Sequence, residues 1–165
     1  MTETARLSLP LLHAGQAQKE VTVNETLQRL DLLTQARVVA VGLNTPPAAP
    51  REGEAWIVGT GPTGGWAGQA GALAGWTGGG WRFVAPTDGM TAWSAVDGCW
   101  AMWTSGGWRL GVIAGRRVEV GGVQVVGARA AAIATPSGGG VVDVEARGAL
   151  MEVLAALRGH GLIAA

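Results

Sequence analysis

The feature that most constrains the fold is an internal repeat in the middle of the chain. A W-T-x-G-G-W-R string begins at Trp76 and recurs 27 residues later, at Trp103. The full set of first-copy residues is Trp66, Gly71, Trp76, Thr77, Gly79, Gly80, Trp81 and Arg82, which match Trp93, Gly98, Trp103, Thr104, Gly106, Gly107, Trp108 and Arg109. A repeat of this period indicates one supersecondary unit used again. Two copies do not support a long solenoid or a propeller.

Each copy is expected to form a β hairpin, in which the four residues after the first tryptophan of the string make the turn. A regular turn places Trp76 opposite Trp81 and Trp103 opposite Trp108. Such aromatic pairs each stabilise a hairpin by about 0.2–1 kcal/mol. Alternation along the strands then predicts one face with Ala72, Ala74, Trp76, Trp81 and Phe83, and another with Leu73, Arg82 and Val84.

Glycine and tryptophan extend this β pattern through the middle of the chain. The 28 glycines are interleaved with eight tryptophans and with β-branched residues, which favours many tight turns rather than disorder. Short strands are expected from Glu54 to Ile113, and the strand-like pattern continues over residues 117–135.

The two ends of the chain differ from the middle. Residues 1–16 read as an extended apolar arm that must lie against its own domain or a neighbouring subunit. Thr22 and Glu25 have the spacing of a capping box, which predicts a helix start there and an end before Val38. The helix should bury one face and turn another toward solvent, namely Val23, Leu27, Leu30 and Leu33 against Arg29, Asp31 and Gln35. A last helix is predicted from Val144 to Arg158, with Asp143 as N-cap and Gly159 at its stop.

The fold class is therefore α+β and mainly β, with an N-terminal arm and helix, a Trp/Gly-rich antiparallel β domain with a duplicated hairpin, and a C-terminal helix. The predicted domains are residues 1–37 for assembly or attachment, residues 38–135 for the β domain, and residues 136–165 for the C-terminal helix segment.

Charge and cysteine content restrict the partners. The 12 basic and 12 acidic residues cancel, so nucleic acid and anionic membranes are poor candidates. Cys99 is the single cysteine, which excludes an intrachain disulfide. The N-terminus lacks the pattern of a signal peptide, and no apolar run reaches the ~18 residues that span a membrane. We expect a protein made in a reducing cytoplasm, without membrane insertion.

The tryptophans allow two interpretations. An exposed aromatic face can stack on sugar rings, whereas a buried one fills the core of a small β domain. Core is the more frequent fate of any one ring. The best candidates for exposed, glycan-binding rings are Trp66, Trp93 and Trp100, because the first two lie outside the hairpin pairs and the third alternates with Trp103.

Catalytic chemistry finds little support in the sequence. His13 and His160 are far apart and have no cluster with metal-ligand spacing around them, so no metal and no cofactor is expected. Acidic residues that could form a glycosidase pair are Glu52, Glu54, Asp88 and Asp97, and nothing fixes their separation. Cys99 lies in an apolar strand, and no nucleophile motif is present. We expect no catalytic residues.

The N-terminal string from Leu9 to Val21, L-P-L-L-H-A-G-Q-A-Q-K-E-V, is distinctive. With Asn24-Glu25, Leu27–Asp31, Gly53–Val58 and Gly79–Phe83, it resembles a domain family of historically unassigned function. That family occurs in alphaproteobacterial prophages and gene transfer agents, in tail-fibre and head-spike-type proteins. The resemblance covers about residues 4–110, and Val141–Ile163 resembles C-terminal segments of some members. It implies a virion component that meets the host surface, and it supplies no catalytic residues.

These observations lead to one expected function and two alternatives. The chain is expected to be a structural or adhesin subunit of a phage-like particle, assembled in the bacterial cytoplasm. Its partners would be copies of itself, with trimer and pentamer both open, other particle proteins, and surface polysaccharide. The expected assembly residues are Leu7, Leu9, Leu11, Leu12, Leu150, Leu154 and Leu157. The alternatives are a stand-alone carbohydrate-binding module and a cell-wall or capsule hydrolase.

Overall fold

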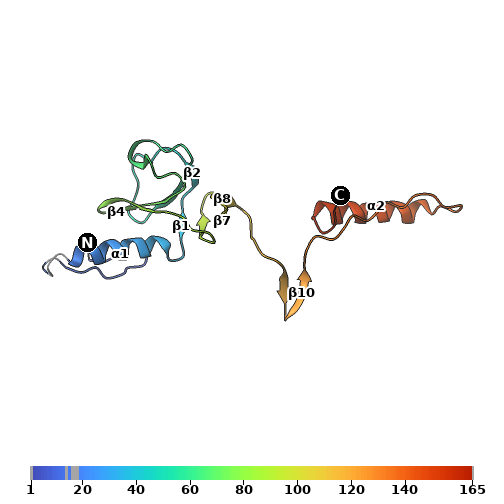
Figure 1. Cartoon of the computed structure of the whole chain (residues 1–165), viewed down its shortest axis with the longest axis horizontal. Coiled ribbons are helices and arrows are strands. Elements are labelled where there is room, and N and C mark those ends of the chain that lie inside the picture. Colours follow the sequence, from blue (N-terminus) through green and yellow to red (C-terminus); the bar gives the residue numbers. More distant parts are fainter. Residues whose placement is uncertain (1, 14, 16–18, 165) are drawn as a thin grey trace. The chain divides into compact units, whose positions relative to one another are not determined.

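The computed structural model describes residues 2–13, 15 and 19–164, and its chain divides into two compact units, Met1–Ile113 and Ala114–Ala165 (Figure 1). Within the described residues it is mainly β, with ten strands in three sheets and an α helix toward each end. The predicted fold class is confirmed. The predicted β domain, residues 38–135, spans the division between the two units.

The first unit holds two four-stranded sheets. The first sheet has the order β2 (Val41–Leu43), β3 (Ala55–Val58), β4 (Leu73–Thr77) and β5 (Gly80–Val84). The second sheet has the order β1 (Arg37–Val38), β6 (Thr91–Ser94), β7 (Cys99–Thr104) and β8 (Gly107–Leu110). In each sheet three antiparallel strands are joined by a short parallel strand, β2 or β1. These two short parallel strands were not predicted.

The duplicated hairpins form as predicted. Trp76 pairs with Trp81 in β4 and β5, and Trp103 pairs with Trp108 in β7 and β8. The strands extend further than expected, since the threonine of each string also pairs across the hairpin. Each connection therefore has two residues rather than four.

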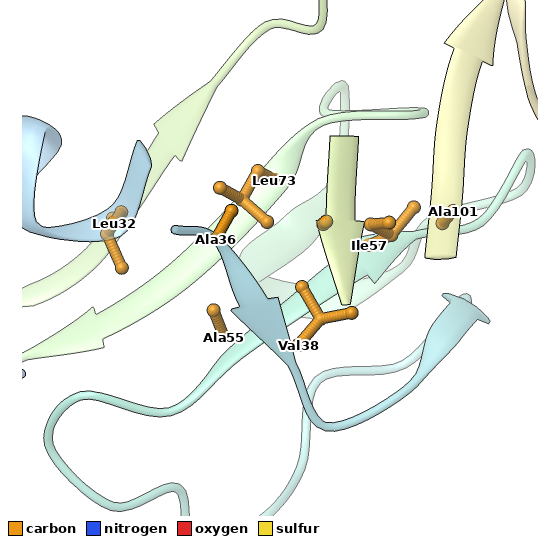
Figure 2. Packing of buried hydrophobic residues seen from close by; sticks show 8 residues of the cluster. Leu32, Ala36, Val38, Ala55, Ile57, Leu73 and Ala101 are labelled. Atoms are coloured by element: carbon orange, nitrogen blue, oxygen red, sulfur yellow. The ribbon is translucent and has the colours of Figure 1, made fainter. Parts of the chain in front are cut away.

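The main core lies between the two sheets. It comprises Leu32, Ala36, Val38, Ala55, Ile57, Leu73, Ala92 and Ala101. Figure 2 shows these side chains converging from strands of both sheets and from the end of the first helix. A second cluster covers the opposite face of the first sheet and is built around Trp56, Val58, Trp66 and Ala74. The predicted separation of the two faces of β4 and β5 is thus confirmed.

The two copies of the repeat stack in the same orientation. In the first sheet, the Trp76–Trp81 pair lies on the face turned away from the main core. In the second sheet, Trp108 packs against the main core, and its Nε1 donates to the carbonyl oxygen of Gly71 at 2.7 Å. The face of the first copy that lacks the tryptophan pair is therefore covered by the tryptophan-bearing face of the second copy.

Helix α1 runs from Lys19 to Leu33, so the prediction that it starts at Thr22 was wrong. Thr22 lies inside the helix, where its carbonyl accepts from the Thr26 hydroxyl, and Glu25 binds Arg82 instead of capping. The predicted buried face was also wrong. Val23, Leu30 and Leu33 are exposed and Leu27 is half-buried, whereas Leu32 and Asp31 are buried.

The cause of this difference is a polar anchor between α1 and the arm. The buried carboxylate of Asp31 accepts hydrogen bonds from the Thr4 hydroxyl at 2.8 Å and from the backbone N–H groups of Arg6 and Leu7 at 3.1 and 2.7 Å. The Arg6 guanidinium donates to the carbonyl of Asp31 in the last turn of the helix and to those of Thr34 and Gln35 just beyond its end. The described part of the arm thus folds onto its own unit.

The second unit holds a hairpin and a helix. Strands β9 (Val118–Val120) and β10 (Val123–Val126) pair around Gly121-Gly122. Helix α2 spans Val144–Gly159, and the Asp143 side chain accepts from Ala146 N as predicted. Its stop lies beyond the expected Gly159, at a Schellman motif in which Gly161 takes φ +72°.

Candidate binding face

The outward face of the second sheet carries an exposed aromatic pair. Trp93 on β6 and Trp100 on β7 are direct cross-strand partners. Their ring centroids lie 5.4 Å apart with an interplanar angle of 79°, an edge-to-face arrangement. Trp100 is 43% exposed, and Trp93 is half-buried. Two of the three tryptophans predicted as surface rings are thus brought together.

Strand alternation explains why these rings point outward. Ala92, Ser94 and Ala101 alternate with the two tryptophans and are fully buried on the inner side of the sheet. Small residues at these positions let the two sheets approach closely. The large rings are left for the opposite face.

Further residues share this outward face by strand register. Arg37 pairs with Trp93, and Met102 pairs with Thr91 on one side and Arg109 on the other. The Trp93–Trp100 face therefore consists of Arg37, Thr91, Trp93, Trp100, Met102 and Arg109. Both arginines are exposed, and the four strands of this sheet contain no carboxylate. The face is aromatic at its centre and cationic on its outer strands.

The expectation that Trp66 is exposed was wrong. It is the last residue of a short 3-10 turn, Gly64–Trp66, and its ring is completely buried. The ring packs against Trp56 and Trp81, with centroid distances of 6.3 and 5.1 Å. Trp66 thus completes the second core on the outer face of the first sheet, together with Trp56, Val58 and Ala74.

Sequence reasoning missed a cleft at one end of the two stacked sheets. It has a volume of about 600 Å³. Its side-chain lining includes Val41, Asn44, Ile57, Thr60, Trp103 and Trp108. The duplicated tryptophan string was a signal for this site. It was interpreted only as a hairpin pair, because the parallel strand β2, which forms the opposite wall, was not predicted.

The acidic residues considered for catalysis are dispersed in turns. Glu54 accepts from the backbone N–H of Arg51 at 2.9 Å, and Asp97 accepts from the Ser94 hydroxyl. Glu52 and Asp88 are exposed. Among the described residues, no three His, Cys, Asp or Glu side chains could together hold a metal ion. None of the helices in that part of the chain is long and apolar enough to cross a membrane.

The leucines expected at an assembly interface have different surroundings. Leu7, Leu12 and Leu150 are exposed, at 38%, 36% and 54%. Three others, Leu9, Leu11 and Leu157, are half-buried. Leu154 is 7% exposed, so it packs within its own unit rather than at a free surface.

Comparison with known proteins adds one match. A family model described as a protein of unknown function (DUF2793) matches residues 23–109. The matched region contains most of α1 and all but the last residue of the two four-stranded sheets, and with them the Trp93–Trp100 face. No curated protein matches the chain.

Proposed function

Because the chain belongs to the DUF2793 family of proteins of unknown function, we propose its role from its own surfaces: a non-catalytic structural and surface-binding subunit of a phage-like particle. The resemblance of residues 4–110 to prophage and gene-transfer-agent proteins supports the particle. The two units support a division of labour, in which the first binds bacterial surface glycans and the second assembles.

The exposed Trp93–Trp100 pair is the observation that carries this function. An exposed indole ring on a sheet can stack on the apolar face of a sugar ring at a low cost in side-chain entropy, since tryptophan has few rotamers. Because the two rings lie edge-to-face, Trp100 offers the ring face and Trp93 supports it from the side. The threonine and arginines of the same face supply hydrogen-bond donors around the rings.

The glycan-binding role is tested with the full chain on an array of bacterial surface polysaccharides. We expect Trp100→Ala to weaken binding about tenfold, the effect of losing about 1.4 kcal/mol of contact energy. Val96→Ala is the matched control, because Val96 is 74% exposed in the turn between β6 and β7. An array without binding contradicts this role. Release of reducing ends from a bound polysaccharide contradicts the non-catalytic assignment.

The assembly role is supported by the apolar surface of the second unit. Its buried hydrophobic residues, among those described, are Leu154 and Ile163. The exposed ones include Val118, Val120, Val123, Val125, Val126, Val144, Leu150, Met151 and Val153. A lone two-stranded hairpin is marginally stable in water. Another surface, in our proposal a second copy of the unit, would bury these valines.

Native mass spectrometry of the full chain tests the assembly role. We expect a homo-oligomer, and we expect Val120→Lys to shift the population toward monomer because a charge is costly in an apolar interface. Val96→Lys, at an exposed valine of the first unit, is the matched control. A strict monomer for the unmodified chain would rule out self-assembly.

A further inference from the structure

We propose that the Trp93–Trp100 face binds a polysaccharide that carries carboxylate groups, with Arg37 and Arg109 as the residues that bind them. This inference rests on the proposed glycan-binding function and names the class of glycan. Arg37 lies on β1 and Arg109 on β8, the two outer strands of the second sheet. The tryptophans lie on the two central strands between them.

Neither arginine has a partner in the described part of the chain. Ion pairs there join Arg82 to Glu25 and Arg117 to Glu119, and no hydrogen bond involves the guanidinium of Arg37 or Arg109. Both residues are exposed, and each adjoins a residue on the core side of its strand, the buried Val38 on β1 and the half-buried Trp108 on β8. The strands therefore fix the backbone positions of both arginines on the face, while their guanidinium groups remain available to a ligand.

The repeat itself indicates what an arginine at this position binds. Arg109 in the second copy corresponds to Arg82 in the first. The Arg82 Nε donates to the Glu25 carboxylate at 2.8 Å, and its Nη2 lies 2.5 Å from the same oxygen. Glu25 reaches Arg82 from α1, which packs beside β5. The described residues supply Arg109 with no carboxylate, so a carboxylate on the ligand would take this place.

The spacing of the face favours a polymer over a small anion. Three steps between neighbouring strands separate β1 from β8, about 14 Å at the usual strand spacing. A chain of sugar rings can cover the tryptophans and reach both arginines, whereas a single small anion reaches one. Arginine binds carboxylates with two parallel hydrogen bonds, which adds specificity to the stacking of the rings.

Nucleic acid also combines anionic groups with flat rings, but the charges favour the polysaccharide. Affinity for nucleic acid comes mainly from many phosphate contacts. This face has two cations, and the whole chain has no net charge. We therefore assign the carboxylated polysaccharide and keep single-stranded DNA as a test.

The experiment measures binding of the full chain to polygalacturonate, alginate and hyaluronate by titration calorimetry. Fully methyl-esterified polygalacturonate is the neutral probe with the same backbone, and a thymidine oligonucleotide is the competing polyanion. We expect affinity at least tenfold higher for polygalacturonate than for its ester, falling as salt rises. Arg37→Gln and Arg109→Gln should each lower affinity for the acid about tenfold, and by clearly less for the ester, which offers hydrogen-bond acceptors but no carboxylate.

Arg29→Gln removes an exposed arginine from α1 and serves as the control for a change in total charge. The near-ultraviolet circular dichroism of the tryptophans checks that each variant remains folded. Equal affinity for acid and ester, with loss on Trp100→Ala, overturns the inference and leaves the proposed glycan binding intact. Failure to bind all three carboxylated polymers, or tighter binding of the oligonucleotide, also overturns it. Failure on the polysaccharide array as well removes the proposed glycan binding itself.

Discussion

Ser105 distinguishes the two copies of the hairpin at the scale of a single residue. In the second copy, Ser105 and Gly106 both have positive φ, +52° and +80°, which is the pattern of a type I′ turn. In the first copy, where a glycine replaces the serine, the positive φ falls on Gly80 instead, at +96°. A positive φ costs an ordinary residue about 1 kcal/mol or more. The two copies of the repeated sequence thus form turns of different conformation, and the turn of the second copy is strained at Ser105.

Replacing Ser105 should therefore stabilise the hairpin of β7 and β8. Asparagine tolerates a positive φ, and an Asn-Gly pair is the preferred centre of a type I′ turn. We expect Ser105→Asn to raise the unfolding free energy by about 0.5–1 kcal/mol and the melting temperature by a few degrees. Gly106→Ala, at the neighbouring position, should have the opposite effect. Calorimetric scans that show no increase for Ser105→Asn would contradict the turn assignment.

Asp31 is a second residue whose replacement should change the stability of the first unit, because of the hydrogen bonds that surround it. It is 2% exposed and accepts three hydrogen bonds from the arm. We expect Asp31→Ala to destabilise the first unit by about 2–4 kcal/mol, because the donors of the arm lose their acceptor. The arm should also become sensitive to trypsin at Arg6. Urea unfolding and timed proteolysis measure the two effects, with exposed Asp88→Ala as control. An arm that stays protected in the variant would show that other contacts hold it.

At the scale of elements, a glycine on β4 determines how closely α1 approaches the first sheet. A Cβ added at Gly75 would lie 2.2 Å from Cδ2 of Leu32. Leu32 is buried in the main core, so its side chain has little room to move. The close approach of α1 to β4 therefore depends on the contact between Leu32 and Gly75.

This contact predicts coupling between the two positions. Gly75→Ala should cost about 1–3 kcal/mol through overpacking, and Leu32→Ala about 2–5 kcal/mol through the cavity that it leaves. The double variant should be less destabilised than the sum of the two by at least about 1 kcal/mol, because the new methyl group enters that cavity. Chemical denaturation of the four proteins completes the cycle. Additive effects would place α1 elsewhere.

How well each element could be predicted depended on whether its partners lie nearby in sequence. The hairpins and the N-cap at Asp143 follow from residues a few positions apart, and the structure has them as predicted. The outward direction of Trp100 followed from alternation with Trp103. The buried face of helix α1 was predicted wrongly, because its apolar residues recur at the spacing that is typical of a buried helix face. Its real anchor, Asp31, depends on arm residues more than 20 positions away.

The candidate site was predictable in its rings but not in its charges. Trp93 could be chosen from the sequence because it lies outside the duplicated hairpin pairs, and Trp100 because it alternates with Trp103. Trp66 was misplaced, because the loop that folds it over Trp56 has no short-range signal. Arg37 was not considered, since it joins the face through a two-residue parallel strand that pairs with a segment more than 50 residues away.

At the scale of the whole molecule, the second unit predicts stability that depends on concentration. If its exposed valines are buried by copies of the same chain, unfolding also separates the copies. The midpoint of thermal unfolding, followed by the helical signal of α2, should rise by several degrees over a hundredfold increase in protein concentration. A midpoint that stays constant over this range would indicate that the unit is stable without self-association.

The segment from Arg37 to Leu43 has a consequence for how the first unit loses its structure. It contributes β1 to the second sheet and, two residues later, β2 to the first. Between them, the Val39 N–H donates to Ala55 in the first sheet, while the Val39 carbonyl accepts from Val96 beside the second. Neither sheet can detach without withdrawing an edge strand from the other. The first unit should therefore melt as one cooperative block, although it holds two four-stranded sheets of similar build.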